Sequence, residues 1–250
     1  RMISRLSIGS GNARDLVQLH GALMQIPNIR TMINQVQCVN NATAPSLNDS
    51  IFNEKESNES PLLLSQLGNL LHDVPEVTEL ISLSIVAEPP VALKEGGIIR
   101  KGFNPALDKL RTGATEGKDW IAKLQQEEIE KTGITSLKVR YNSVFGYFIE
   151  VTKANLERVP EHYTRKQTLA NAERFITPEL KEMEGKILGS EERSQKLEYE
   201  LFQGVREQVL QWLPQIQEIS SALAQLDVLA GFAENARIHD HVCPNVRDEG

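Results

Sequence analysis

The chain has 250 residues, enough to bury a substantial core, and its hydrophobic content of 40% and charged content of 24% are those of an ordinary globular protein. No apolar run approaches the ~20 residues that a membrane span needs, so no membrane partner is expected. Two cysteines make no disulfide framework, and a net charge of −7 argues against a protein that binds nucleic acid over its whole surface.

Helical patterns begin the chain. Over residues 12–39, leucine and isoleucine recur every three or four positions, and Pro27 predicts a break or a new helix start. Residues 40–60 are polar and rich in Asn and Ser, which predicts a disordered insertion or a loop. The helical pattern resumes over residues 62–71 and again over 76–81.

A glycine pair stands out within residues 91–103. Short apolar runs flank Gly96 and Gly97, an arrangement typical of a hairpin with a tight glycine turn. A phosphate-binding loop is the alternative, but no Lys-Ser/Thr follows the glycines, and G-x-x-x-x-G-K-[ST] occurs nowhere in the chain. We therefore predict a hairpin here, and a chain that has no cofactor and is not an enzyme.

Two long helices are predicted on either side of a short central segment. The first covers residues 104–132, where Gly113 and Gly117 predict a bend or a short break. The second covers residues 178–212 and would span about 50 Å. A further helix over residues 215–236 is apolar enough to be a central core helix.

The segment between the long helices differs in charge and in period. Residues 133–178 hold seven Lys/Arg and four Asp/Glu, a net charge of +3, whereas the rest of the chain has 20 basic and 30 acidic residues, a net charge of −10. Alternating patterns predict paired strands over residues 137–142 and 147–152. Residues 165–169 and 174–176 are expected to form a second pair, with a helical turn as the alternative.

These elements predict a mainly α fold: a helical core with long antiparallel lever helices that carry a small inserted antiparallel β-sheet. The expected domains are residues 1–132 (core and first lever helix), 133–177 (the basic β-module) and 178–250 (second lever helix and return into the core). A short insertion on two antiparallel helices is expected to sit at their far ends.

The strand order then predicts which loops face outward. In an up-down-up-down sheet, the connections at residues 142–146 and 170–171 share the end away from the helices, and the connection at 153–163 lies back towards them. The outward loops and their neighbouring strands offer the amides, hydroxyls and cations that bind phosphate oxygens. The candidate DNA-backbone contacts are Lys138, Arg140, Asn142, Ser143, Arg165, Lys166, Thr168, Asn171 and Arg174.

The predicted partner is the backbone of duplex DNA. No recognition helix or set of bidentate base readers is present in the pattern, so the contact should be sequence-independent and weakened by salt. The alternative is a structural protein–protein interaction module with no direct DNA contact, which binds an acidic protein through the same loops. No metal site or catalytic residue is predicted, because the His and Cys residues of 239–243 have no second cluster to complete a zinc site.

Several motifs resemble the MutS family of DNA mismatch repair proteins. They are EGGIIRKGFN at residues 95–104, GYFIEV at 146–151 and, most specifically, QTLANAERFITPELKE at 167–182. The resemblance implies a helical core whose lever helices carry a clamp domain, with paired clamps of two subunits closing around duplex DNA and touching its backbone. Some members have Lys before the tip Asn, where this chain has Ala170 before Asn171.

The resemblance also implies parts that lie outside this chain. A mismatch-reading domain is expected before Arg1, and an ATPase that uses ATP and Mg after Gly250, so that the parent protein is a DNA-dependent ATPase. The insertion is longer than expected of bacterial members. A cytoplasmic or nucleoid location in a bacterium and a mitochondrial or other organellar location in a eukaryote therefore both stay open.

Overall fold

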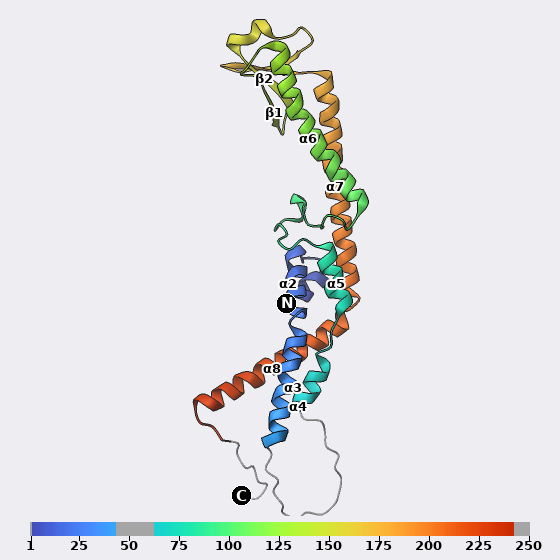
Figure 1. Ribbon diagram of the computed structural model, residues 1–250, viewed down its shortest axis with the longest axis vertical. Coiled ribbons are helices and arrows are strands. Elements are labelled where there is room, and N and C mark those ends of the chain that lie inside the picture. Colours follow the sequence, from blue (N-terminus) through green and yellow to red (C-terminus); the bar gives the residue numbers. More distant parts are fainter. Residues whose placement is uncertain (1, 44–62, 243–250) are drawn as a thin grey trace, which may run out of the picture. The chain divides into compact units, whose positions relative to one another are not determined.

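The computed structural model describes residues 2–43 and 63–242 (Figure 1). The fold is mainly helical with one small antiparallel sheet, as predicted. The chain divides into two compact units, the first formed by Arg1–Val91 with Gly204–Gly250 and the second by Ala92–Gln203.

The regular elements described in the first unit are helices, apart from a single β-bridge residue at Ile85. Its helices are α1 (Met2–Ser7), α2 (Ala13–Leu23), α3 (Ile26–Thr43), α4 (Leu63–Leu70), α5 (Pro75–Ser84), the last turns of α7 (Pro178–Leu210) and α8 (Leu213–Ile238). Asn12 and Asp15 form a reciprocal capping box at the start of α2. Helix α2 packs on α1 and α5, and α4 packs on α3 and α8. The helix break expected at Pro27 is confirmed, because α3 begins one residue earlier.

Two predictions for this unit need revision. The insertion predicted over residues 40–60 lies outside the described residues, except that α3 continues through Thr43. Helix α8 buries only its first half, through Ile216, Ile219 and Ala222, whereas Val228 and Phe232 are 54% and 67% exposed. Its apolar side chains lie on several sides of the helix, so packing within the described residues covers only part of them.

The second unit carries the sheet. Its elements are η1 (Leu93–Glu95), α6 (Pro105–Thr132), β1 (Lys138–Asn142), β2 (Gly146–Thr152), η2 (Lys153–Arg158), β3 (Thr164–Thr168), β4 (Ala172–Ile176) and most of α7. The strand order is β1-β2-β4-β3, and each neighbouring pair is antiparallel. Asn104 caps the start of α6, and Gly133, in the left-handed region, ends it.

Helices α6 and α7 run side by side within this unit (Figure 1). Helix α6 is continuous, so of the predicted bend or short break at its glycines the break is absent. A Cβ at Gly117 would overlap the side chain of Ile187 on α7, which shows that this glycine allows close approach of the two helices. Lys118 and Glu191 add an ion pair of 2.7 Å beside this contact.

The sheet packs against the last turns of α6 and the first turns of α7. One cluster of buried residues combines α6 and α7 side chains with those of the sheet: Ile121, Leu124, Ile134, Leu137, Ile149, Val151, Tyr163, Phe175, Leu180 and Ile187. In Figure 1 the strands lie beside the end of α6. The module therefore sits at the far ends of the two helices, as predicted, and the apolar stripes of α6 and α7 continue under the sheet and supply its core.

The glycine pair forms no hairpin. Residues Leu93–Glu95 make a 3₁₀ turn, and Gly96 and Gly97 both have a φ of 73°. The next backbone N–H groups converge on Glu198 of α7: Gly97 N lies 3.1 Å from Oε2, Ile99 N lies 2.8 Å from Oε1, and Ile98 N also donates to Oε1. Arg111 Nη2 completes the ring of donors at 2.7 Å. We call the segment of residues 96–99, in which the N–H groups of Gly97, Ile98 and Ile99 face Glu198, the glycine loop.

Candidate nucleic-acid interface

The turn between β1 and β2 lies against α7. Tyr147 N donates to Glu184 Oε2 at 3.0 Å, and a Cβ at Gly146 would overlap that carboxylate. Asn142 Oδ1 accepts from Val144 N at 2.8 Å and closes the turn, while Ser143 is exposed on it. Asn142 and Ser143 therefore belong to the end of the sheet that α7 supports.

The turn between β3 and β4 lies at the opposite end. Thr152, the last residue of β2, pairs with Ala172 of β4, and Lys153 N donates to Asn171 O at 3.1 Å. Since β2 runs from Gly146 to Thr152 at about 3.3 Å per residue, the two turns are about 20 Å apart. We call this end, formed by residues 169–171 with the starts of β1 and η2, the Asn171 end.

Two parts of the predicted topology are therefore wrong. The connections at 142–146 and 170–171 do not share one end, and the connection after β2 begins beside residues 170–171 and not at the opposite end from them. The reason is the strand order: β4 lies between β2 and β3, so β2 and β3 run in the same direction. The connection after β2 therefore begins at the Asn171 end and returns to the opposite end before β3 starts. Simple up-and-down reasoning assumes that strands pair in chain order.

The three predicted arginines all have carboxylate partners within the sheet. Arg140 and Arg174 both lie near Glu150, at 3.6 and 3.4 Å, and Arg165 lies 3.0 Å from Glu173. The Arg174 side chain is 20% exposed. These cations are neutralised by the protein itself.

Arg174 is held from three sides. Besides Glu150, it donates through Nη1 to Gln167 at 2.8 Å, and its guanidinium carbon lies 4.3 Å from the centre of the Phe148 ring. Phe148 is buried although it points away from the helix-covered face of the sheet, because Arg174 covers its ring. The Arg174 guanidinium therefore stabilises the sheet by linking neighbouring strands and covering Phe148.

The predicted lysines differ from the arginines. Lys138 and Lys166 are exposed, and neither has an ion-pair partner within residues 2–43 and 63–242. Thr168 and Asn171 are exposed at the same end of the sheet. The structure thus separates the candidate residues into paired arginines, unpaired lysines with the Asn171 turn, and the distant Asn142–Ser143 turn.

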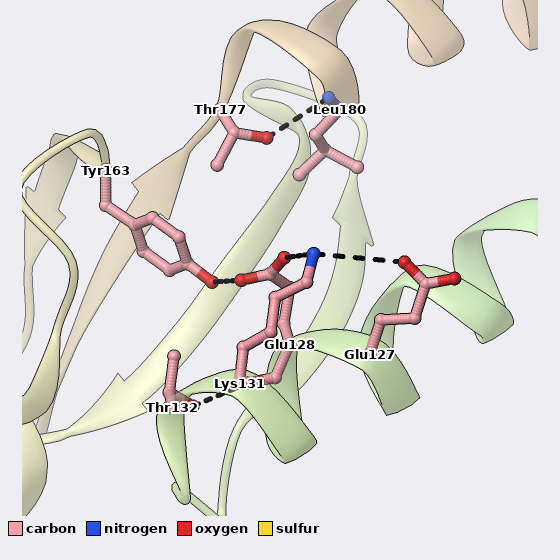
Figure 2. Close-up of polar contacts among 7 residues, drawn as sticks. All are labelled: Glu127, Glu128, Lys131, Thr132, Tyr163, Thr177 and Leu180. Carbon is pink, nitrogen blue, oxygen red and sulfur yellow. Dashed lines mark hydrogen bonds and ion pairs between the residues drawn. The ribbon is translucent and has the colours of Figure 1, made fainter.

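A buried polar cluster joins the sheet to α6 (Figure 2). Tyr163 donates its hydroxyl to Glu128 Oε2 at 2.6 Å, and Lys131 Nζ lies 3.0 Å from Glu128 Oε1. Thr132 donates to the Glu128 carbonyl, and Thr177 accepts from Leu180 N at the start of α7. These contacts fix the position of β3 and β4 relative to α6 and α7.

Burial and hydrogen bonding shift the pKa values of both Glu128 and Tyr163 in this cluster. Burial alone would raise the pKa of Glu128, but the hydrogen bonds from Tyr163 and Lys131 outweigh burial and lower the pKa below its usual 4.5. Burial, followed by the hydrogen bond to the carboxylate, raises the pKa of Tyr163 well above its usual 10.0. Glu128 is therefore charged and Tyr163 neutral near pH 7.

Sequence reasoning missed the carboxylates that organise this unit. Glu184 and Glu198 are buried on α7, and Glu128 is buried on α6. The signal was their spacing: Glu184 and Glu198 continue the buried face of α7 that also includes Ile187 and Phe202.

Comparison with known proteins identifies the unit that carries the sheet. Residues 102–193 match the model of MutS family domain IV. The whole chain is 44% identical to the DNA mismatch repair protein MutS of Halothermothrix orenii, over 250 residues. Over its whole length the chain is therefore similar to a segment of MutS-family proteins. Over 246 residues, 98% of the chain, it is 45% and 46% identical to the MutS proteins of Alkaliphilus oremlandii and Myxococcus xanthus.

The chain spans about 25% of the length of each of these MutS relatives. The domain IV match includes all four strands and the parts of α6 and α7 that pack on them. Among the helices that the structure describes, none is both long and apolar enough to cross a bilayer.

Proposed function

We propose that this chain holds duplex DNA for a MutS-type mismatch repair protein, through sequence-independent contacts of the Asn171 end with the sugar–phosphate backbone. The observation that carries the proposal is the difference between the cations of the sheet. The arginines are neutralised by Glu150 and Glu173, whereas Lys138 and Lys166 have no ion-pair partner in the described residues. Unpaired lysines, a hydroxyl and an amide suit phosphate oxygens.

The proposal gives this chain a binding role and no catalytic one. The sequence contains no phosphate-binding loop motif, and the N–H groups of the glycine loop are already occupied by Glu198. ATP hydrolysis with Mg, recognition of mismatches and pairing with a second subunit are proposed for the longer parent protein, in keeping with its family.

The test is a titration of the chain with a labelled duplex of arbitrary sequence over a salt series. We expect weak binding whose logarithmic affinity falls linearly with the logarithm of salt concentration. Lys166→Gln should reduce the slope by about one unit, because one phosphate contact is lost. Asn171→Ala should weaken affinity by about 1 kcal/mol, the net value of one hydrogen bond, with little change of slope.

Lys196→Gln is the matched control. Lys196 is an exposed lysine on α7, and it has no ion-pair partner among the residues described. Its replacement should leave affinity and slope unchanged. Binding that is insensitive to Lys166 and Asn171, or a tighter complex with an acidic protein than with DNA, would contradict the proposal and favour a protein–protein interaction module.

A further inference from the structure

We propose that the start of η2 forms a second half of the phosphate-binding surface, with Lys153 as its anchor. This inference rests on the proposed function and adds a second chain segment to that surface. It was excluded by the sequence-based topology, which placed the connection after β2 on the opposite side from Asn171. The structure places Lys153 directly beside Asn171, because Lys153 N donates to Asn171 O at 3.1 Å.

The backbone of Lys153 is held in place, while its ammonium group forms no ion pair with the described residues. It follows Thr152, the last residue of β2, and neighbouring strands lie about 4.8 Å apart, so Lys153 and Asn171 extend from adjacent backbone positions. Lys153 is exposed, and the described part of the chain offers it no ion-pair partner. Its ammonium group is therefore available to a ligand at this end.

Acidic groups do not cancel this charge. Glu150 is the closest carboxylate along β2, and Arg140 and Arg174 already pair with it. Glu157 lies at the other end of η2 and is exposed. The Arg158 guanidinium donates to the Gly133 carbonyl at 3.4 Å, so that cation stays at the end of α6.

A cluster of hydroxyls beside Lys153 supplies a further donor. Ser136 Oγ and Thr152 Oγ1 lie 3.2 Å apart, and Asn155 Nδ2 donates to both, at 3.1 Å each. One hydroxyl hydrogen is used between Ser136 and Thr152, and both oxygens accept from Asn155. The second hydroxyl hydrogen has no acceptor within the cluster and is free for a phosphate oxygen.

The ligand class follows from these groups. A flexible ammonium, a hydroxyl and an amide side chain on adjacent segments bind anionic oxygens without reading bases, which is the chemistry of a phosphodiester backbone. Consecutive phosphates of one strand rise about 3.4 Å along the duplex axis, so two adjacent segments suit neighbouring phosphates of one strand. We therefore assign Lys153 and Asn171 to one backbone stretch of duplex DNA.

The experiment compares Lys153→Gln with Lys196→Gln in the full chain, using the labelled duplex at about 50 and 200 mM salt. At the lower salt concentration, Lys153→Gln should weaken binding about tenfold and reduce the salt slope by about 0.9. Lys153→Arg should retain binding because it keeps the charge. Thermal unfolding should be the same for all three variants, since Lys153 is exposed.

The outcomes separate this inference from the proposed function. If Lys166→Gln and Asn171→Ala weaken binding while Lys153→Gln matches wild type, the inference is wrong and the proposed function stands. If none of these variants changes binding, the proposed function itself fails. The last measurement adds inorganic phosphate to the complex with the labelled duplex at matched ionic strength. Displacement of the duplex by low millimolar phosphate would indicate a site for free phosphate and overturn the assignment to duplex DNA.

Discussion

The glycine loop and the Asn171 end both gather groups that bind anions, but they differ in what they bind. In the glycine loop, three successive N–H groups and Arg111 surround Glu198, whose side chain is 4% exposed. Such a concave arrangement of N–H groups is a general anion site. At the Asn171 end, lysines, hydroxyls and an amide are exposed, and the described residues supply no carboxylate to Lys153 or Lys166.

This difference distinguishes an anion site that the fold itself occupies from the proposed DNA-binding end of the same unit. An internal carboxylate satisfies the donors of the glycine loop and holds it to α6 and α7. The lysines of the Asn171 end gain little from the fold and remain available to an external anion. The same criterion sorts the sheet's own cations, because Arg140, Arg165 and Arg174 have carboxylate partners and Lys138 has none among the residues that the structure describes.

The largest expected effect is at the glycine loop. Glu198→Ala would leave Arg111 and three N–H groups without their shared acceptor in a buried site. Removing one partner of a buried, hydrogen-bonded ion pair costs about 3–5 kcal/mol, so we expect a loss of that size in the free energy of unfolding. Urea denaturation measures it, and hydrogen exchange should show faster exchange at residues 97–99.

Glu200→Ala is the control for that experiment. Glu200 is exposed two residues further along α7, and its replacement should change stability by less than about 0.5 kcal/mol. A Glu198 variant as stable as the control would show that the glycine loop does not depend on its internal anion, and the contrast with the Asn171 end would lose its basis.

A smaller effect is expected where α6 meets the sheet. Tyr163→Phe keeps the packing of the ring but removes the donor to Glu128. Leaving a buried acceptor unsatisfied costs about 1–3 kcal/mol, and the ion pair with Lys131 should keep the loss within that range. Thermal or urea unfolding at pH 7 checks the value, and DNA binding per folded molecule should be unchanged.

The same pair predicts a pH dependence. Because the pKa of Glu128 is lowered in the folded protein, its contribution is present above pH 4.5 and is lost as pH falls through the folded pKa. Because the pKa of Tyr163 is raised, its contribution is present below pH 10.0 and is lost as pH rises beyond that value. Tyr163→Phe should therefore flatten the loss of stability above pH 10, and an unchanged alkaline profile would contradict the assignment.

Local patterns predicted most of the elements but not their long-range partners. The long helices, both hairpins of the sheet and the helix start near Pro27 follow from periodicity and from Gly and Pro signals. The hairpin predicted at Gly96 and Gly97 was wrong, because their conformation depends on Glu198, about a hundred residues away. Neither glycine spacing nor the apolar residues around them carries information about that contact.

The candidate site was predicted in composition but not in arrangement. The alternating pattern within residues 133–178 predicted the strands of the sheet, yet the sequence did not show that β4 inserts between β2 and β3. That crossing separates Asn142 from Asn171 and brings Lys153 beside Asn171. Cross-strand register alone does not show which cations are neutralised: Glu150 faces Lys138 and Arg174 in register, but its ion pairs are with Arg140 and Arg174.

The smallest effect on DNA binding is expected for a cation that the sheet already uses. Arg174→Gln removes the contacts with Glu150, Gln167 and the Phe148 ring, and should cost about 1 kcal/mol of stability. Because this guanidinium has internal partners, its loss should leave the salt slope of duplex binding unchanged. Lys166→Gln should do the opposite, with unchanged stability and a slope lower by about one unit. Measured side by side, a fall in slope for Arg174→Gln equal to that of Lys166→Gln would mean that internal pairing does not withhold a cation from DNA.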